Sequence, residues 1–263
     1  MWHMKSENLL FNFRHSYSGN LKDDESLTWV ECSEIEECVR YCSAHAEKQL
    51  KDKINRFDIS GIHFIDSGDY HYMTKFITDR IKEPFSLVMI DHHTDMQKPI
   101  VKGLTSCGNW AWCVLEENPH LVQLVLIGQE QRFIDELDLS NSRNREKVLT
   151  ISEKEISDEH AKDKFMKIKR DAPVYLSIDK DVLSGKEAIT NWDQGNMSVD
   201  CLKSLIRFFL VRWNVIGVDL CGEVPNAFIK AEYDRERRIN SRLNQELYSY
   251  IMEYSNRRQP SVL

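Results

Sequence analysis

Short uninterrupted apolar runs, separated by longer amphipathic stretches, most constrain how this chain can fold. The runs predict strands at residues 9–13, 61–66, 86–91, 121–128, 147–151, 174–179 and 214–220. Strands that read as continuous apolar runs are typical of parallel sheets whose two faces are both buried. Helices between the strands would cover those faces. The pattern therefore predicts an α/β fold, a three-layer α/β/α sandwich on a mainly parallel central sheet.

The amphipathic stretches predict helices at residues 33–57, 70–81, 109–117, 157–169, 198–211 and 238–256. Ser33 and Glu36 form a Ser-x-x-Glu capping box, which predicts that the first helix begins at Ser33. No repeat, low-complexity tract or Pro- and Gly-rich linker divides the 263 residues. We therefore expect a single domain over residues 1–263, which is long enough to bury a full core.

The composition argues against several classes of function. The net charge is −7, whereas a protein that binds the phosphate backbone of nucleic acids needs a basic surface. No apolar run reaches the roughly eighteen residues that predict a membrane span, and the N-terminus lacks the layout of a signal peptide. The seven cysteines have no spacing typical of a disulfide framework. We expect reduced thiols in a cytoplasmic protein that acts on a small molecule.

Acidic and histidine side chains follow four of the predicted strands at their carboxyl ends. The segments run from Asp66 to His71, from Asp91 to Asp95, from Asp179 to Asp181 and from Asp219 to Glu223. Ligands of parallel sheets bind beyond the carboxyl ends of the strands. A buried carboxylate costs several kcal/mol unless it is paired or binds a metal. The repetition therefore predicts a binding site at this edge of the sheet.

Two of these segments carry the most specific pattern. Asp91, His93 and Asp95 lie at i, i+2 and i+4, so their side chains would share one side of an extended strand, and Asp179 and Asp181 repeat the i, i+2 spacing. Facing each other, the segments would place four carboxylates in one cavity, and four like charges cannot all stay ionised without cations. Charge balance favours two divalent ions. An oxygen-rich set with few imidazoles suits Mn²⁺ better than structural Zn²⁺.

These motifs resemble those of the arginase/agmatinase (ureohydrolase) superfamily over about residues 60 to 225. The segment "DHHTD" is similar to the family's Asp-Ala-His-x-Asp motif, and "SIDKDVL" to its Ser-x-Asp-x-Asp-x-x-Asp-Pro motif. The segment "DSGDYH" is similar to Gly-Gly-Asp-His, and "GVDLCGEVP" to a late strand with an Asp and a substrate-facing Glu. The resemblance implies a three-layer α/β sandwich with a binuclear manganese site.

The resemblance also implies which residues bind the two ions. The implied ligands are His71, Asp91, His93, Asp95, Asp179 and Asp181. His71 and Asp91 would help to bind one ion and His93 the other. Asp95 and Asp179 would bridge or be shared, and Asp181 would lie on the side of the second ion.

The chemistry implied by the resemblance is hydrolysis of a C–N bond in a guanidino- or amide-type small molecule. Asp95 would hydrogen-bond the attacking water and carry its proton. Glu223 could anchor a cationic substrate by a charge-assisted contact.

The sequence departs from the family pattern at several points. Tyr70 separates Asp69 from His71, where the family His follows its Asp directly. Either a small bulge restores His71 as a ligand, or Asp69 or His92 takes its place. His92 stands where the family has Ala. The Gly-Asn-x-His segment, whose His transfers a proton in arginases, here reads Gly-Asn-Trp-Ala. These departures argue against a straightforward arginase.

Two alternative functions stay open. A deacetylase-like amidohydrolase would use one metal and recruit His92 or His71 to an acid–base pair. A non-catalytic arginase-fold protein would fit the missing histidine, although its unpaired buried carboxylates would destabilise it. Two bound ions would favour the ureohydrolase-like function, one the deacetylase-like function and none the binding protein. The charged run at 232–238 is either a solvated helix start or an oligomer interface, so a homo-oligomer is also open.

Overall fold

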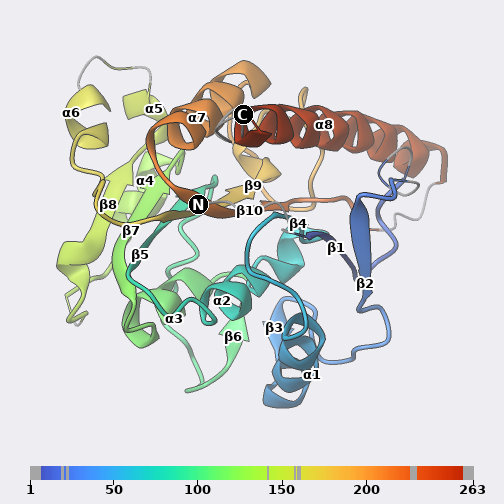
Figure 1. Cartoon of the computed structure of the whole chain (residues 1–263), viewed down its shortest axis with the longest axis horizontal. Coiled ribbons are helices and arrows are strands. Elements are labelled where there is room, and N and C mark those ends of the chain that lie inside the picture. Colours follow the sequence, from blue (N-terminus) through green and yellow to red (C-terminus); the bar gives the residue numbers. More distant parts are fainter. Residues whose placement is uncertain are drawn as a thin grey trace, which may run out of the picture.

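A wholly parallel eight-stranded sheet forms the centre of the computed structural model, which describes residues 7–18, 21, 24–140, 142–156, 158, 161–225 and 230–256 (Figure 1). In order across the sheet, the strands are β2 (Leu27–Glu31), β1 (Asn8–Asn12), β4 (Ile62–Phe64), β10 (Val215–Cys221), β9 (Val174–Asp179), β5 (Phe85–Ile90), β7 (Leu121–Ile127) and β8 (Val148–Ile151). Each neighbouring pair of strands runs parallel.

Helices cover both faces of this sheet. On one face lie α1 (Ala44–Ile54), α2 (Met73–Thr78) and α3 (Trp110–Glu117), and on the other lie α7 (Val199–Arg212) and α8 (Lys230–Asn256) (Figure 1). The short helices α4 (Gln131–Asp135), α5 (Glu153–Ile156) and α6 (Ala161–Phe165) lie towards the β8 end of the sheet. The sheet and its two helical layers confirm the predicted α/β sandwich.

Strand alternation divides the apolar core into two clusters. In β5, Leu87 and Met89 pack in the cluster that contains Phe76 of α2, whereas Val88 and Ile90 pack in the cluster that contains α7 and α8. Successive residues of a strand point to opposite faces of the sheet, and helices cover both faces. Side chains on both faces of β5 are therefore buried. This is why the central strands read as uninterrupted apolar runs.

The predicted start of the first helix at Ser33 is wrong. Helix α1 begins after Ser43, whose hydroxyl accepts a hydrogen bond from the N–H of Ala46 at 3.1 Å. Glu37 and Arg40 have φ angles of +57° and +62°, which a right-handed helix cannot contain. The segment before α1 forms turns and the short strand β3 (Tyr41–Cys42), which pairs antiparallel with β6 (Thr105–Ser106).

Other differences are at the ends and the edges of elements. The edge strand β2, the short strands β3 and β6, and helix α4 were not predicted. Helix α8 begins at residue 230 rather than 238, and α6 is shorter than the predicted helix at 157–169, part of which lies outside the described residues.

All seven cysteines are free thiols, and six of them are buried. Within the described ranges, every helix is too short or too polar to cross a membrane.

Candidate metal centre

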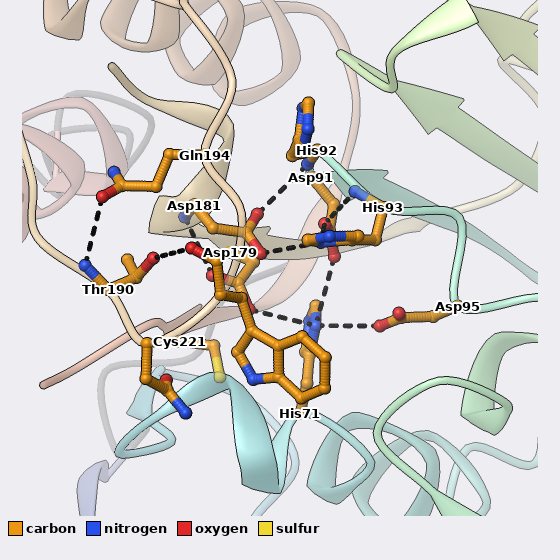
Figure 2. Close-up of polar contacts among 12 residues, drawn as sticks. His71, Asp91, His92, His93, Asp95, Asp179, Asp181, Thr190, Gln194 and Cys221 are labelled. Atoms are coloured by element: carbon orange, nitrogen blue, oxygen red, sulfur yellow. Dashed lines mark hydrogen bonds and ion pairs between the residues drawn. The ribbon is translucent and has the colours of Figure 1, made fainter. Parts of the chain in front are cut away.

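Four neighbouring strands bring the predicted polar segments to one edge of the sheet. These strands are β4, β10, β9 and β5, and they are adjacent in space although they lie far apart in the sequence. Asp91 directly follows β5, Asp179 ends β9, and Cys221 ends β10. A 3₁₀ turn after β4 (Gly68–Tyr70) leads to His71. Figure 2 shows the side chains of these segments pointing towards one another.

His71 faces three carboxylates. Its Nδ1 atom lies 3.3 Å from Asp91 Oδ2, 3.2 Å from Asp95 Oδ2 and 3.5 Å from Asp179 Oδ2 (Figure 2). Its other ring nitrogen lies 2.8 Å from the hydroxyl of Ser177, which fixes the orientation of the ring. His71, Asp91 and Asp95 offer ligand atoms that all lie within 4.8 Å of one another, as a bound ion would require. We call these three residues the first donor set.

His93 belongs to a second donor set. Its Nδ1 atom lies 2.9 Å from Asp181 Oδ2 and 3.7 Å from Asp91 Oδ1. The ligand atoms of Asp91, His93 and Asp181 again lie within 4.8 Å of one another. Asp91 is therefore common to both sets, with Oδ2 towards His71 and Oδ1 towards His93 (Figure 2). A carboxylate that gives one oxygen to each of two donor sets suits a pair of ions.

Loop geometry, rather than the expected strand alternation, arranges the segment from Asp91 to Asp95. Strand β5 ends at residue 90, and Asp95 has a left-handed backbone with a φ angle of +50°. The N–H of His93 donates to Asp91 Oδ1 at 2.6 Å, and the N–H of His92 donates to Asp181 Oδ1 at 3.2 Å. The prediction that Asp91, His93 and Asp95 share one side of an extended strand does not apply. The loop itself turns them towards the sheet edge.

The segment from Asp66 to His71 contributes His71 to the first donor set. The 3₁₀ turn accommodates the extra residue Tyr70, whose ring stacks on Phe13 with centroids 3.9 Å apart. Asp69 turns away from the donor sets, and its Oδ1 atom accepts a hydrogen bond from Arg40 Nε at 3.0 Å. Asp69 is therefore not placed to substitute for His71.

His92 also lies outside both donor sets. Its Nε2 atom is 3.8 Å from Glu130, and its ring meets Phe133 edge-on with centroids 5.5 Å apart. Burial lowers the pKa of His92, and the neighbouring His93 lowers it further. A neutral imidazole in this position supports the loop and is not directed at the cluster.

An indole orients Asp95 in the segment that lacks the family histidine. The Nε1–H group of Trp110 donates to Asp95 Oδ2 at 2.5 Å, and its ring centroid lies 4.7 Å from that of His71. Trp110 is fully buried. A tryptophan in the first turn of an amphipathic helix normally belongs to the core, so no signal in the sequence indicated this contact.

Glu223 does not line the cavity above the donor sets. Its buried carboxylate contacts Lys180 Nζ and accepts a hydrogen bond from Asn244 Nδ2 at 2.6 Å. Lys180 Nζ also donates to Asn244 Oδ1 at 2.8 Å. This geometry does not support the expected contact with a cationic substrate. Instead, the group ties the turn that contains Asp179 and Asp181 to helix α8.

Cys221 stands beside the first donor set. Its thiol could join His71 and Asp179 around an ion, since their ligand atoms lie within 4.8 Å of one another. However, Sγ lies 3.4 Å and 3.3 Å from the backbone carbonyls of Ile65 and Ser67, to which it donates. Burial raises the pKa of Cys221 well above its ordinary value, and Asp179 raises it further. A neutral thiol is a poor ligand, so the oxygen and imidazole donors dominate the site.

A cavity of about 270 Å³ opens above both donor sets. Its acidic and histidine lining consists of His71, Asp91, His93, Asp95, Asp179 and Asp181. The other lining residues are Arg40, Tyr41, Gly68, Thr94, Gln97, Ser106, Cys107, Gly108, Phe133 and Trp192. Trp192 packs so closely on Gly68 that a Cβ atom added there would lie 2.7 Å from Trp192 Cδ1. The space fits a small molecule.

The crowded carboxylates shift one another's pKa values. Burial raises the pKa of Asp91 well above its ordinary value of 3.8, and Asp181 and Asp95 raise it further. Burial, followed by Asp179, raises the pKa of Asp181 in the same way. Burial alone would lower the pKa of His71, but its carboxylate partners raise it well above 6.5. Divalent cations would relieve the repulsion among these buried carboxylates, and the residues present fit a pair of such ions.

The metal-free protein is expected to lose stability as the pH rises above the ordinary carboxyl pKa of 3.8. An acid whose pKa is raised by folding favours the folded state only while protonated. Asp91 and Asp181 therefore destabilise the fold as the pH rises above the ordinary value of 3.8 through their raised values. His71 changes the stability in the same direction, because its stabilising positive charge is lost as the pH rises through its own raised pKa. Thermal unfolding of chelator-treated protein measures this slope.

Saturating Mn²⁺ should flatten that profile, because the ions replace the protons. An Asp91→Asn/Asp181→Asn double variant should also show a shallower slope without metal. An unchanged slope in the double variant would contradict the assignment of the effect to this cluster.

Comparisons with known proteins agree with the fold. The family model described as "Arginase family" matches residues 5–243. An uncharacterized protein of Thermotoga maritima is 30% identical over 195 residues, which cover 74% of this chain and 70% of that protein.

Solved structures share the fold at low sequence identity. Proclavaminate amidino hydrolase from Streptomyces clavuligerus has a TM-score of 0.70 at 14% identity, with 98% of this chain and 94% of that one covered. Formiminoglutamase from Trypanosoma cruzi, solved with Mn²⁺, has a TM-score of 0.64 at 14% identity, with 97% and 95% covered. At this identity the two structures establish a common fold alone. The match of the family model over most of the sequence shows that the chain belongs to the arginase family.

Proposed function

We propose that this protein is a binuclear, Mn²⁺-dependent hydrolase that cleaves a C–N bond in a small guanidino- or amide-type molecule. The observation that carries the proposal is the position of Asp91, which gives one oxygen to each of two donor sets. Membership of the arginase family supports a hydrolase of this kind. Proteins of this fold named above act on amidino and formimino compounds, so a planar C–N group is the expected target.

The six sequence-predicted ligands would divide between two ions. His71, Asp91, Asp95 and Asp179 would hold one ion, whereas Asp91, His93 and Asp181 would hold the other. Two divalent ions would lower the pKa of a water molecule and stabilise charge that develops on the atoms bonded to the carbon under attack. The remaining chemistry belongs to side chains of this protein.

Asp95 is the residue we propose for proton transfer. Trp110 holds one carboxylate oxygen by its indole N–H, at 2.5 Å, and so fixes the plane of the group. The carboxylate faces the cavity, where it can accept a proton from the attacking water and donate it to the leaving amine. Its left-handed backbone is consistent with a functional constraint, since a non-glycine residue seldom adopts a φ angle of +50°.

The geometry does not favour a deacetylase-like mechanism. That mechanism would recruit a histidine pair as acid and base, yet His71 and His93 both face carboxylates. His92 is directed towards Glu130 and Phe133 instead. Among the residues that line the cavity, His71 and His93 are the two histidines, and both belong to donor sets.

Metal reconstitution coupled to a substrate panel tests the proposal. Chelator-treated protein would be titrated with Mn²⁺ by calorimetry and then assayed for release of urea, ammonia or formamide from guanidino and formimidoyl compounds. Acetylated amines would be included, with acetate as the product. We expect two ions per chain and hydrolysis that requires Mn²⁺. Full activity in chelator would refute metal dependence, acetate release with one ion would indicate a deacetylase, and no bound ion would indicate a binding protein.

A further inference from the structure

Arg40 is held at the wall of the cavity in a strained conformation. Its φ angle is +62°, a left-handed backbone that a non-glycine residue seldom adopts. Two backbone hydrogen bonds hold it there: its N–H donates to the Asp69 carbonyl at 3.2 Å, and its carbonyl accepts from the N–H of Cys107 at 2.8 Å. Backbone strain of this kind is commonly retained where a side chain must be aimed.

The guanidinium of Arg40 is oriented by its edge and by its face. Nε donates to Asp69 Oδ1 at 3.0 Å, and the same oxygen accepts from Asn191 Nδ2 at 3.1 Å. The guanidinium carbon lies 5.0 Å from the centroid of the Trp192 ring, within cation–π range. Neither terminal nitrogen, Nη1 or Nη2, has a hydrogen-bond partner in the described part of the chain. The side chain is 54% exposed, so these two donors are accessible.

The position of Arg40 relates it to the donor sets. The Trp192 centroid is 5.0 Å from the guanidinium and 6.0 Å from the centroid of the His93 ring, so the guanidinium lies no more than 11 Å from that ring. Arg40 is also the sole lysine or arginine among the residues that line the cavity. A small molecule with its planar C–N group at the donor sets would therefore extend its other end towards a single, oriented cation.

We propose that Arg40 selects substrates that carry a carboxylate at the end opposite the C–N group that is cleaved. This inference rests on the proposed function and deepens it. Two free N–H donors on one planar guanidinium match the two oxygens of a carboxylate, and such bidentate pairs are among the strongest hydrogen-bonded contacts in proteins. An amine at the same end would meet a like charge. The substrate class is therefore an ω-guanidino or ω-formimidoyl carboxylic acid, rather than the corresponding decarboxylated amine.

Matched acid and amine series test this selection. The acids are guanidino carboxylic acids from guanidinoacetate to 6-guanidinohexanoate, and the amines are aminoalkyl guanidines of equal chain length, including agmatine. The Mn²⁺-loaded wild-type protein would be compared with Arg40→Gln and Arg40→Lys. Arg170→Gln is the control, because Arg170 is likewise exposed and stacks 5.2 Å from Trp213 at the opposite end of the sheet.

We expect the wild-type protein to favour the best acid over its amine at least tenfold in kcat/KM. Arg40→Gln should raise KM for the acid roughly 10- to 100-fold, the range expected for lost charge-assisted hydrogen bonds, and leave kcat within about threefold. Its kinetics with the amine should not worsen. Arg40→Lys should have an intermediate KM for the acid, since lysine keeps the positive charge but lacks the two parallel N–H donors of the guanidinium. Arg170→Gln should behave as wild type.

A binding measurement separates this inference from the proposed function. Thermal unfolding would be followed with ω-amino carboxylic acids and with diamines of equal length, which bind without turnover. If the acids protect the wild-type protein and not Arg40→Gln, the inference stands even if no guanidino compound is hydrolysed. If amines are hydrolysed preferentially, or if Arg40→Gln weakens acids and amines equally, the inference is wrong while the hydrolase remains. Failure of every acid to protect the wild-type protein would also overturn it.

Discussion

Asp181→Asn is expected to reduce bound Mn²⁺ from two ions per chain to one and to lower kcat at least about 100-fold. The reason is that Asp181 belongs to the second donor set alone, where its Oδ2 atom pairs with His93 at 2.9 Å. Asparagine has the same shape and removes the charge. His71, Asp91 and Asp95 keep their contacts, so the first donor set should still bind. Elemental analysis and steady-state kinetics on the same sample measure both effects.

The matched control is Asp58→Asn, an exposed carboxylate that precedes β4 at the far end of the sheet. It should bind two ions and keep full activity. The metal-free Asp181→Asn protein should also be more stable than the metal-free wild type near neutral pH, because burial and Asp179 raise the pKa of Asp181. Two ions with normal turnover in Asp181→Asn would refute the division of ligands proposed here.

Lys180→Met is expected to lower the free energy of unfolding by about 3–5 kcal/mol. The Lys180 and Glu223 side chains are only 1% and 4% exposed, so removal of the cation leaves a buried carboxylate without its counter-charge. Asn244 would still donate one hydrogen bond to that carboxylate, which does not replace the lost charge. Urea unfolding of chelator-treated protein measures the effect without a contribution from bound metal.

Two comparison variants make this expectation specific. Lys180→Met/Glu223→Gln should recover much of the lost stability, since a neutral amide can still accept from Asn244. Lys203→Met breaks a partly exposed pair with Glu246, at 2.8 Å, and should cost less than about 1 kcal/mol. If the double variant were as unstable as Lys180→Met, lost packing rather than an uncompensated charge would be the cause.

Much of the fold could be predicted from the sequence because the signals involved are local. The central strands are buried on both faces, so their apolar runs were visible, and the rule that ligands bind beyond the carboxyl ends of parallel strands indicated where to look. The start of α1 could not be predicted in this way. Ser33 has a partner at the spacing of a capping box, whereas Ser43 caps the helix without one. Glu37 and Arg40, which lie between the two serines, have positive φ angles and prevent the helix from beginning at Ser33. Neither is a glycine, so nothing in the sequence indicated this conformation.

Contacts at the site that join distant segments were beyond sequence reasoning. Trp110 binds Asp95 across a loop, and Arg40 reaches the cavity from a turn that was predicted as helix. Glu223 shows the opposite case. A motif match suggested a substrate contact, but Lys180, which reads as an ordinary lysine between two aspartates, occupies its carboxylate. Such pairings depend on the crossover connections and become visible only in three dimensions.

The order of strands in the sheet has a consequence for how the protein matures. Strands β4, β10, β9 and β5 are neighbours, yet β4 is synthesised long before β9 and β10. Asp179 and Asp181 therefore cannot meet His71 and His93 until at least the first 181 residues have left the ribosome. Long-range parallel pairing is slow. An early fragment contains all three residues of the first donor set, but β10 and β9 must still take their places between β4 and β5 before those residues can be brought together. We therefore expect metal ions to bind late, only to molecules that have completed folding. Bound metal would then indicate a folded protein, and metal binding would not initiate folding.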